Sequence, residues 1–180
     1  GISLRATDTC MRLFYTPLEK ELIEAAVVDP NLKIVYVGIG CGDGIRLLLD
    51  KIENGSGVCY TFDRLRGRRK RLEKIGAKSI DGGKLSVLHE SVGVSCLPDD
   101  WIDVVIHCMY HPFWCQDTKY ALTNLKRVLK PNGKWISGMD IERNEKNRHS
   151  IFPYVGVFEY LQLLDQLGFD NVKVIYNQTD

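Results

Sequence analysis

The sequence predicts one α/β domain built on a doubly wound, mostly parallel sheet. Short apolar runs alternate along the chain with stretches whose apolar residues recur at helical spacing, which is typical of crossover units on a parallel sheet. The chain has 180 residues, the length of one globular domain, and no internal repeat or low-complexity tract marks a boundary. Residues 1–180 are therefore expected to form a single domain.

The first helix is expected from Thr16 to about Val28. Thr16 can cap it, Pro17 suits its first position, and Glu19 completes a capping box. Hydrophobic periodicity then predicts, in order, a strand at 33–37, a helix at 43–53, a strand at 57–62, a basic helix at 64–75, strands at 85–88 and 102–107, a helix at 117–130, a strand at 134–139, an exposed loop at 142–149, a helix at 155–167 and a strand at 172–176. The turn before the strand at 134–139 is expected at Pro131-Asn132-Gly133.

Charge and hydropathy restrict the partners. Lys and Arg number 24 against 23 Asp and Glu, a net charge of +1, so the chain as a whole has no electrostatic attraction to nucleic acid or acidic membranes. No apolar run approaches the ~20 residues that span a bilayer, and the first residues lack a secretory signal. A soluble, cytoplasmic protein without a membrane partner is expected, and a start at Gly1 suggests a trimmed terminus.

Six cysteines occur without a C-x-x-C pair, at positions 10, 41, 59, 96, 108 and 115. They are expected to be reduced thiols, in keeping with a cytoplasmic protein. The segment from His107 to Cys115 contains two histidines and two cysteines, but its C-x6-C spacing matches no standard zinc pattern and Pro112 interrupts it. No metal is expected.

Four glycines lie within seven positions behind the strand at 33–37, in Gly38-Ile39-Gly40-Cys41-Gly42-Asp43-Gly44. Glycine permits a tight strand-to-helix turn and lets a ligand touch the backbone, and ligands of open α/β sheets bind at the carboxyl ends of strands. A dinucleotide fingerprint, G-x-G-x-x-G, fits in neither register. What remains is G-x-G-x-G with an acidic residue in the loop, where a pyrophosphate would be repelled.

This loop and three later segments resemble the class I S-adenosylmethionine-dependent methyltransferases, of the type 11-like group. The resemblance rests on GIGCGDG at 38–44, Phe62-Asp63 after the second strand, LPDDWIDVVI at 97–106 and LKRVLKPNGK at 125–134. It implies a Rossmann-like methyltransferase fold, S-adenosylmethionine as cofactor, and Asp63 as acceptor for the ribose hydroxyls. The cofactor-binding residues that it implies are Gly38, Ile39, Gly40, Cys41, Gly42, Asp63, Arg64, Ser91, Val92 and His107.

The chain departs from the family pattern at three places. Gly38 stands where the family has an acidic residue that helps to hold the loop and the methionine amino group. After the third strand, Glu90 and Ser91 are alternatives for a residue near the adenine. The family's closing antiparallel strand needs residues after Tyr176, so this strand is expected to be lacking or truncated.

The resemblance implies in-line transfer of a methyl group, in which the cofactor carries the reactive group and the protein supplies alignment and desolvation. His107, Tyr110 and His111 follow the fourth strand and are the candidates for a general base. For His107 the competing interpretation is a residue that caps the strand or lines the adenine pocket, and for His111 a surface turn.

Six basic residues within positions 64–71 allow recognition of nucleic acid or another anion, or form the solvated face of a helix. A small-molecule acceptor is favoured over nucleic acid. Two other functions stay open: a non-catalytic, methyltransferase-like binding domain or subunit, and an NADP-dependent oxidoreductase in which Arg64 or Arg66 holds the 2′-phosphate.

Overall fold

Five parallel strands form one sheet in the computed structural model, which describes residues 16–26, 29–63, 65–88, 96–108, 118–139 and 156–175. The strand order is β3-β2-β1-β4-β5. The strands are β1 (Lys33–Val37), β2 (Val58–Phe62), β3 (Leu85–Leu88), β4 (Ile102–Cys108) and β5 (Leu129–Gly138). The predicted parallel α/β architecture is confirmed.

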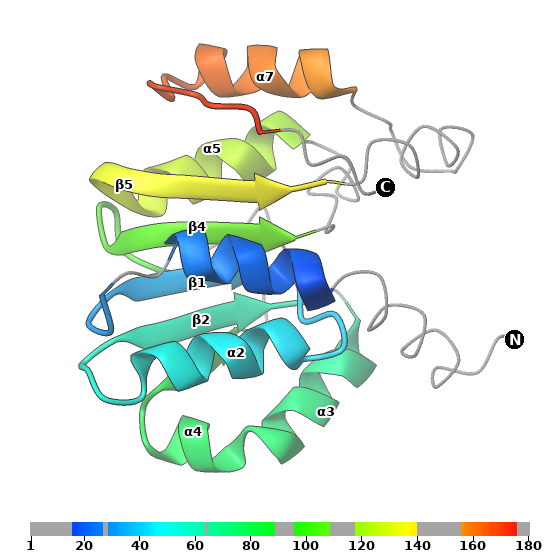
Figure 1. Ribbon diagram of the computed structural model, residues 1–180, viewed down its shortest axis with the longest axis vertical. Coiled ribbons are helices and arrows are strands. Elements are labelled where there is room, and N and C mark those ends of the chain that lie inside the picture. Colours follow the sequence, from blue (N-terminus) through cyan, green and yellow to red (C-terminus); the bar gives the residue numbers. More distant parts are fainter. Residues whose placement is uncertain are drawn as a thin grey trace, which may run out of the picture.

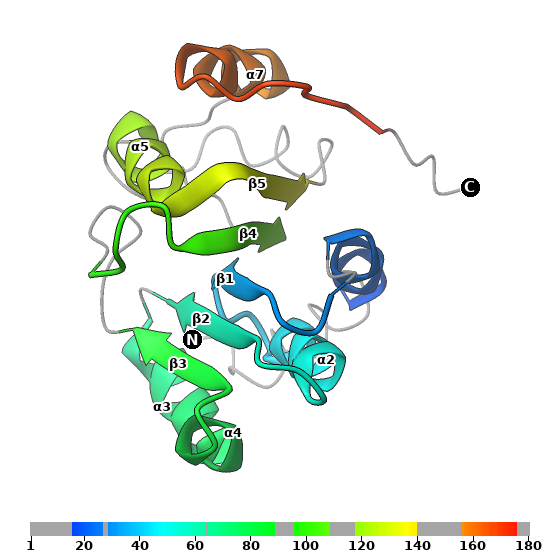
Figure 2. The ribbon, with the colours of Figure 1, turned by 90° about the vertical axis from the view of Figure 1, so that its left-hand side faces the viewer.

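Helices cover both faces of this sheet. They are a helix at 16–26, α2 (Asp43–Ile52), α3 (Arg66–Ile75), α4 (Ala77–Asp81), α5 (Thr118–Val128) and α7 (Val157–Gln166). The helix at 16–26 and α2 lie on one face and α5 on the other, while α7 lies beyond β5 (Figures 1 and 2). None of the described helices has the length and apolar character needed to cross a membrane.

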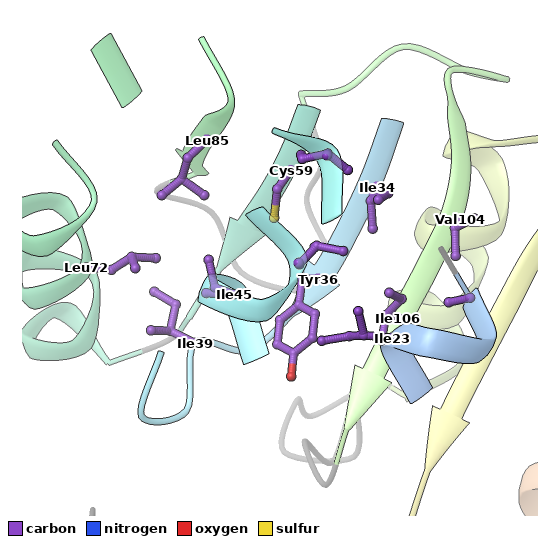
Figure 3. Packing of buried hydrophobic residues seen from close by; sticks show 13 residues of the cluster. Ile23, Ile34, Tyr36, Ile39, Ile45, Cys59, Leu72, Leu85, Val104 and Ile106 are labelled. Atoms are coloured by element: carbon purple, nitrogen blue, oxygen red, sulfur yellow. The ribbon is translucent and has the colours of Figure 1, made fainter. Parts of the chain in front are cut away.

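The core follows from strand alternation, because successive side chains of a strand point to opposite faces. Ile34 and Tyr36 of β1 face the helix at 16–26 and α2, whereas Val35 and Val37 face α5. Figure 3 shows the first cluster, which joins Ile45 of α2 to residues of β1, β2, β3 and β4. Two apolar layers thus sandwich the sheet and fix the register of β1.

The sheet reverses its direction of growth at β1. The chain passes from β1 to β2 and β3 on one side, then returns to place β4 on the other side of β1. Val37, the last residue of β1, is in register with Phe62 of β2 and His107 of β4. The carboxyl ends of the three central strands therefore meet beside the glycine loop, as expected for a ligand site at a topological switch point.

The structure differs from the predicted elements at three places. The strand expected at 134–139 begins earlier, at Leu129, because the backbone of residues 129–133 follows β4 across a register irregularity and α5 ends at Val128. Residues 172–175 form no strand, and Val172, Val174 and Ile175 are exposed. The short helix α4 was not predicted, since Gly76, Gly82 and Gly83 enclose it and indicate a turn.

The predicted capping box is also wrong. Thr16 already lies within the helix at 16–26, so it does not precede the helix as a cap. The Glu19 carboxylate is directed away from its own helix and accepts a hydrogen bond from the Tyr36 hydroxyl. A residue whose spacing fits a local cap thus serves a contact between distant parts of the chain.

Candidate functional site at the carboxyl ends of the strands

The loop after β1 has a backbone that only glycine adopts readily. Gly38, Gly40 and Gly42 have φ values of 85°, 54° and 88°, in the left-handed region that a Cβ disfavours. The Gly38 N–H donates to the Phe62 carbonyl and extends the β1–β2 ladder, while the Gly42 carbonyl accepts from Arg46 in the first turn of α2. The three glycines turn the chain from strand into helix and leave the backbone open to a ligand.

Asp63 holds this loop to the end of β2. Its Oδ2 accepts a hydrogen bond of 3.0 Å from the Ile39 N–H, and its Oδ1 accepts one of 2.8 Å from the Leu65 N–H. The carboxylate is buried, with 1% of the residue exposed, and Nη1 of Arg68 lies 3.6 Å from Oδ2. Backbone amides and an arginine thus compensate the charge of Asp63.

A second carboxylate lies on the other side of the loop, where Glu19 of the helix at 16–26 meets α2. Glu19 Oε1 accepts a hydrogen bond of 2.7 Å from the Tyr36 hydroxyl, and the Gly44 N–H also donates to the carboxylate. A Cβ on Gly44 would lie 2.3 Å from the Tyr36 hydroxyl oxygen and 2.9 Å from Glu19 Oε1. The last glycine of G-x-G-x-G therefore makes room for this pair.

Burial governs the titration of these groups. Desolvation raises the pKa of Glu19 above its ordinary value of 4.5, and the nearby Asp43 charge adds to this, against the hydrogen bonds from Tyr36 and Gly44. Burial and the neighbouring Glu19 carboxylate raise the pKa of Tyr36 well above its ordinary value. Burial also raises the pKa of Cys108, the last residue of β4, so it is a thiol and not a thiolate at neutral pH.

His107 lies inside the sheet at the end of β4. It pairs in register with Val37 and Ser137, is 1% exposed, and stacks on Trp135 with ring centroids 6.4 Å apart. This position adjoins the loop, but the burial favours packing over proton exchange with a substrate. Its predicted roles in catalysis and in cofactor binding stay predictions.

The structure places the glycine loop, Asp63 and His107 next to one another at the ends of β1, β2 and β4. Ile39 contributes its backbone N–H, while its side chain packs in the core. Cys41 is partly exposed. Several predicted residues lie outside the described residues: Arg64, Ser91, Val92, Tyr110 and His111.

The described residues contain no group of three or more side chains that could hold a metal ion. The segment 109–115 lies outside the part of the chain that the structure describes. The expected absence of a metal therefore stays a prediction.

Residues 37–137, more than half of the chain, match the sequence profile of the family described as "Methyltransferase domain". The chain belongs to this methyltransferase family. The match confirms the class I, S-adenosylmethionine-dependent resemblance on which the sequence analysis relied. It spans β1 to β5 and so includes the glycine loop and Asp63.

Proteins similar to this methyltransferase include one curated bacterial sequence and several solved structures. YrhH of Bacillus subtilis (strain 168), named as a candidate methyltransferase, is 23% identical over 161 residues, covering 88% of this chain and 79% of YrhH. A candidate methyltransferase of Haloferax volcanii, solved in complex with the Trm112 methyltransferase activator, has a TM-score of 0.73 and 20% identity, covering 89% of this chain and 71% of that chain. An S-adenosylmethionine-dependent methyltransferase of Aquifex aeolicus has a TM-score of 0.70 and 20% identity, and the match covers 91% of this chain and 85% of that chain. The structural likenesses establish the fold.

The loop of this methyltransferase fits the S-adenosylmethionine that the family implies. Three glycines in the left-handed region leave the backbone accessible at the switch point. The Asp63 carboxylate has about four lone-pair positions. Two backbone N–H groups use two of them, so acceptor capacity for hydroxyl groups remains.

The sequence analysis missed Tyr36 and Gly44 as site residues and gave Glu19 a different role. One signal was present: a tyrosine within the apolar run KIVYV needs a partner for its hydroxyl once it is buried. The identity of that partner follows only from the position of the helix at 16–26, because 17 residues separate Glu19 from Tyr36.

Proposed function

We propose that this methyltransferase transfers the methyl group of S-adenosylmethionine to a small-molecule acceptor, with the loop 38–42 and Asp63 holding the cofactor. The observation that carries the proposal is the left-handed backbone of Gly38, Gly40 and Gly42 at the switch point, tied to Asp63 through the Ile39 N–H. When bound, the cofactor supplies an electrophilic methyl group on a sulfonium. The protein then contributes orientation and exclusion of water.

The surroundings of Asp63 favour a small acceptor over nucleic acid. Two arginines of the basic run turn toward Asp63: Arg68 approaches its carboxylate, and Arg69 donates to its main-chain carbonyl. Both side chains are half-buried and contact Asp63, so these two cations stabilise the loop and are less available to a phosphate than exposed arginines would be. The basic run is therefore in part a structural support of the cofactor site.

The test is calorimetric titration with S-adenosylhomocysteine and, separately, with NADP. The wild-type chain is expected to bind S-adenosylhomocysteine with micromolar affinity and not to bind NADP. Asp63→Ala is expected to weaken binding by at least about a hundredfold, because it removes a buried charged acceptor and releases the loop. Asp81→Ala removes an exposed carboxylate of α4 and serves as the matched control with unchanged affinity.

Binding of NADP alone would contradict the proposal. Binding of neither ligand would favour the non-catalytic domain or subunit. If S-adenosylhomocysteine binds, a turnover assay with a panel of methyl acceptors separates an enzyme from a domain that only binds cofactor. Thermal unfolding of Asp63→Ala shows whether its loss of affinity reflects the site or the fold.

A further inference from the structure

Glu19 is a half-buried carboxylate, and no described residue beside it is a cation. Among the described residues, the groups that act on its pKa are the Tyr36 hydroxyl, the Asp43 carboxylate and the Gly44 N–H, and none of them is a cation. A carboxylate withdrawn from water is costly unless a positive charge or enough hydrogen bonds compensate it. The two hydrogen bonds do not offset desolvation here, since the pKa of Glu19 is still raised.

The position of Glu19 relates this charge to the proposed cofactor site. Its carboxylate lies against the first turn of α2, which begins directly after the glycine loop, and its charge reaches Cys108 at the end of β4. In Figure 3 the Tyr36 ring points along the strands toward the ends at which the arrowheads of β4 and β5 lie. The Tyr36 hydroxyl thus fixes Glu19 near the carboxyl end of β1, where the glycine loop begins.

S-adenosylmethionine carries a protonated amino group at one end, and such a group needs anionic or carbonyl acceptors. Three described carboxylates lie around the loop. Asp63 is compensated by two backbone amides and Arg68, and Asp43 is in the first turn of α2. Glu19 combines a fixed orientation with a charge that no cation in the described part of the chain compensates.

We propose that Glu19 binds the α-amino group of the cofactor, with Tyr36 and Gly44 as positioning residues that orient its carboxylate. This assignment rests on the proposed function. Gly38 does not compete for the role, because it has no side chain and its φ of 85° disfavours one. The helix at 16–26 therefore supplies an anion that the loop itself lacks.

The test is a thermodynamic cycle that combines one change in the protein with one change in the ligand, and calorimetry measures the four binding affinities. One change is Glu19→Gln, whose amide oxygen can still accept from Tyr36 and Gly44. The other change replaces S-adenosylhomocysteine by its deamino analogue, which keeps the carboxylate and lacks only the amino group. The wild-type chain is expected to prefer S-adenosylhomocysteine by about tenfold to a hundredfold, and Glu19→Gln to reduce this ratio to about one.

Two variants control the cycle. Glu24→Gln removes an exposed charge from the same helix, paired only loosely with Lys20 at 4.0 Å, and is expected to leave both affinities unchanged. Asp43→Asn tests the neighbouring carboxylate. If the preference for the amino group collapses in Asp43→Asn and persists in Glu19→Gln, Asp43 is the ligand and the assignment is wrong.

A purely structural Glu19 would give a different result. Glu19→Gln would then weaken the binding of both ligands by the same factor, or change neither affinity. The ratio of the two affinities would persist, which also contradicts the assignment. A wild-type chain that binds S-adenosylhomocysteine without preference over the deamino analogue contradicts only this assignment. A wild-type chain that binds neither ligand contradicts the proposed function as well.

Discussion

The two ends of the sheet differ in how they compensate a half-buried carboxylate. At the amino ends, Asp103 of β4 accepts a hydrogen bond of 2.5 Å from Lys130 Nζ and one of 2.8 Å from the Lys33 N–H. Although burial opposes it, these bonds and the two lysine charges lower the pKa of Asp103. At the carboxyl ends, Glu19 has a hydroxyl and an amide as partners and a raised pKa.

This difference separates a carboxylate that stabilises the fold from one that is suited to a ligand. Asp103 has its cations supplied by the chain, and the cavity of about 200 Å³ beside it lies at the amino ends of β1 and β4, away from the switch point. Glu19, at the opposite end, has no cation among the described residues. Under the proposed assignment, the amino group of the cofactor would supply that cation.

The largest expected effect comes from crowding the Glu19 and Tyr36 pair. Gly44→Ala places a Cβ 2.3 Å from the Tyr36 hydroxyl oxygen, so one partner must move, and we expect unfolding free energy to fall by about 1 to 3 kcal/mol. Gly67→Ala in α3 is the matched control, since no atom lies within 4 Å of its new Cβ, and is expected to stabilise by roughly 0.5 to 1 kcal/mol. Urea unfolding measures both, and equal effects would contradict the crowding.

A smaller effect is expected from the tyrosine hydroxyl alone. Tyr36→Phe leaves the ring in the core but removes the donor to Glu19, which should lower unfolding free energy by about 1 kcal/mol. Tyr60→Phe on the neighbouring strand is the control, because among the described residues its hydroxyl has only a 3.5 Å contact with Trp101 Nε1. The midpoint of thermal unfolding should fall clearly in Tyr36→Phe and little in Tyr60→Phe. Similar decreases would show that the hydrogen bond to Glu19 adds no stability of its own.

The smallest effects are two pH dependences of opposite sign. The pKa of Glu19 is raised in the folded state, so its contribution to stability is present below its ordinary value of 4.5 and is lost as pH rises through the raised value. The pKa of Asp103 is lowered, so its contribution is present above 3.8 and is lost as pH falls through the lowered value.

Comparison with Glu19→Gln and Asp103→Asn by urea unfolding between pH 3 and pH 7 checks both signs. The wild-type chain should lose stability relative to Glu19→Gln as pH rises, and relative to Asp103→Asn as pH falls. If the difference in unfolding free energy between wild type and variant changed with pH in the same direction for Glu19→Gln and for Asp103→Asn, the two ends of the sheet would not differ.

Two of the four family signals prove to be structural once their contacts are seen. The segment 97–106 and the segment 125–134 bond to each other, through Asp103 with Lys130 and through Arg127 with Asp99 and the Leu97 carbonyl. Neither segment contributes a residue to the predicted cofactor site. The contacts between the two segments lie at the amino ends of the strands, away from the glycine loop.

The sequence by itself determined the elements that rest on local patterns. Alternating apolar runs, helical spacing and glycines predicted the five observed strands, most of the helices and the loop 38–44, because periodicity and left-handed backbone are properties of neighbouring residues. The same patterns also predicted a strand at 172–176 that residues 172–175 do not form, and they missed α4. The tertiary structure decided which charges meet. Glu19 and Tyr36 are 17 residues apart and Asp103 and Lys130 are 27 apart, so whether each carboxylate has a cation depends on how helices and strands pack around it.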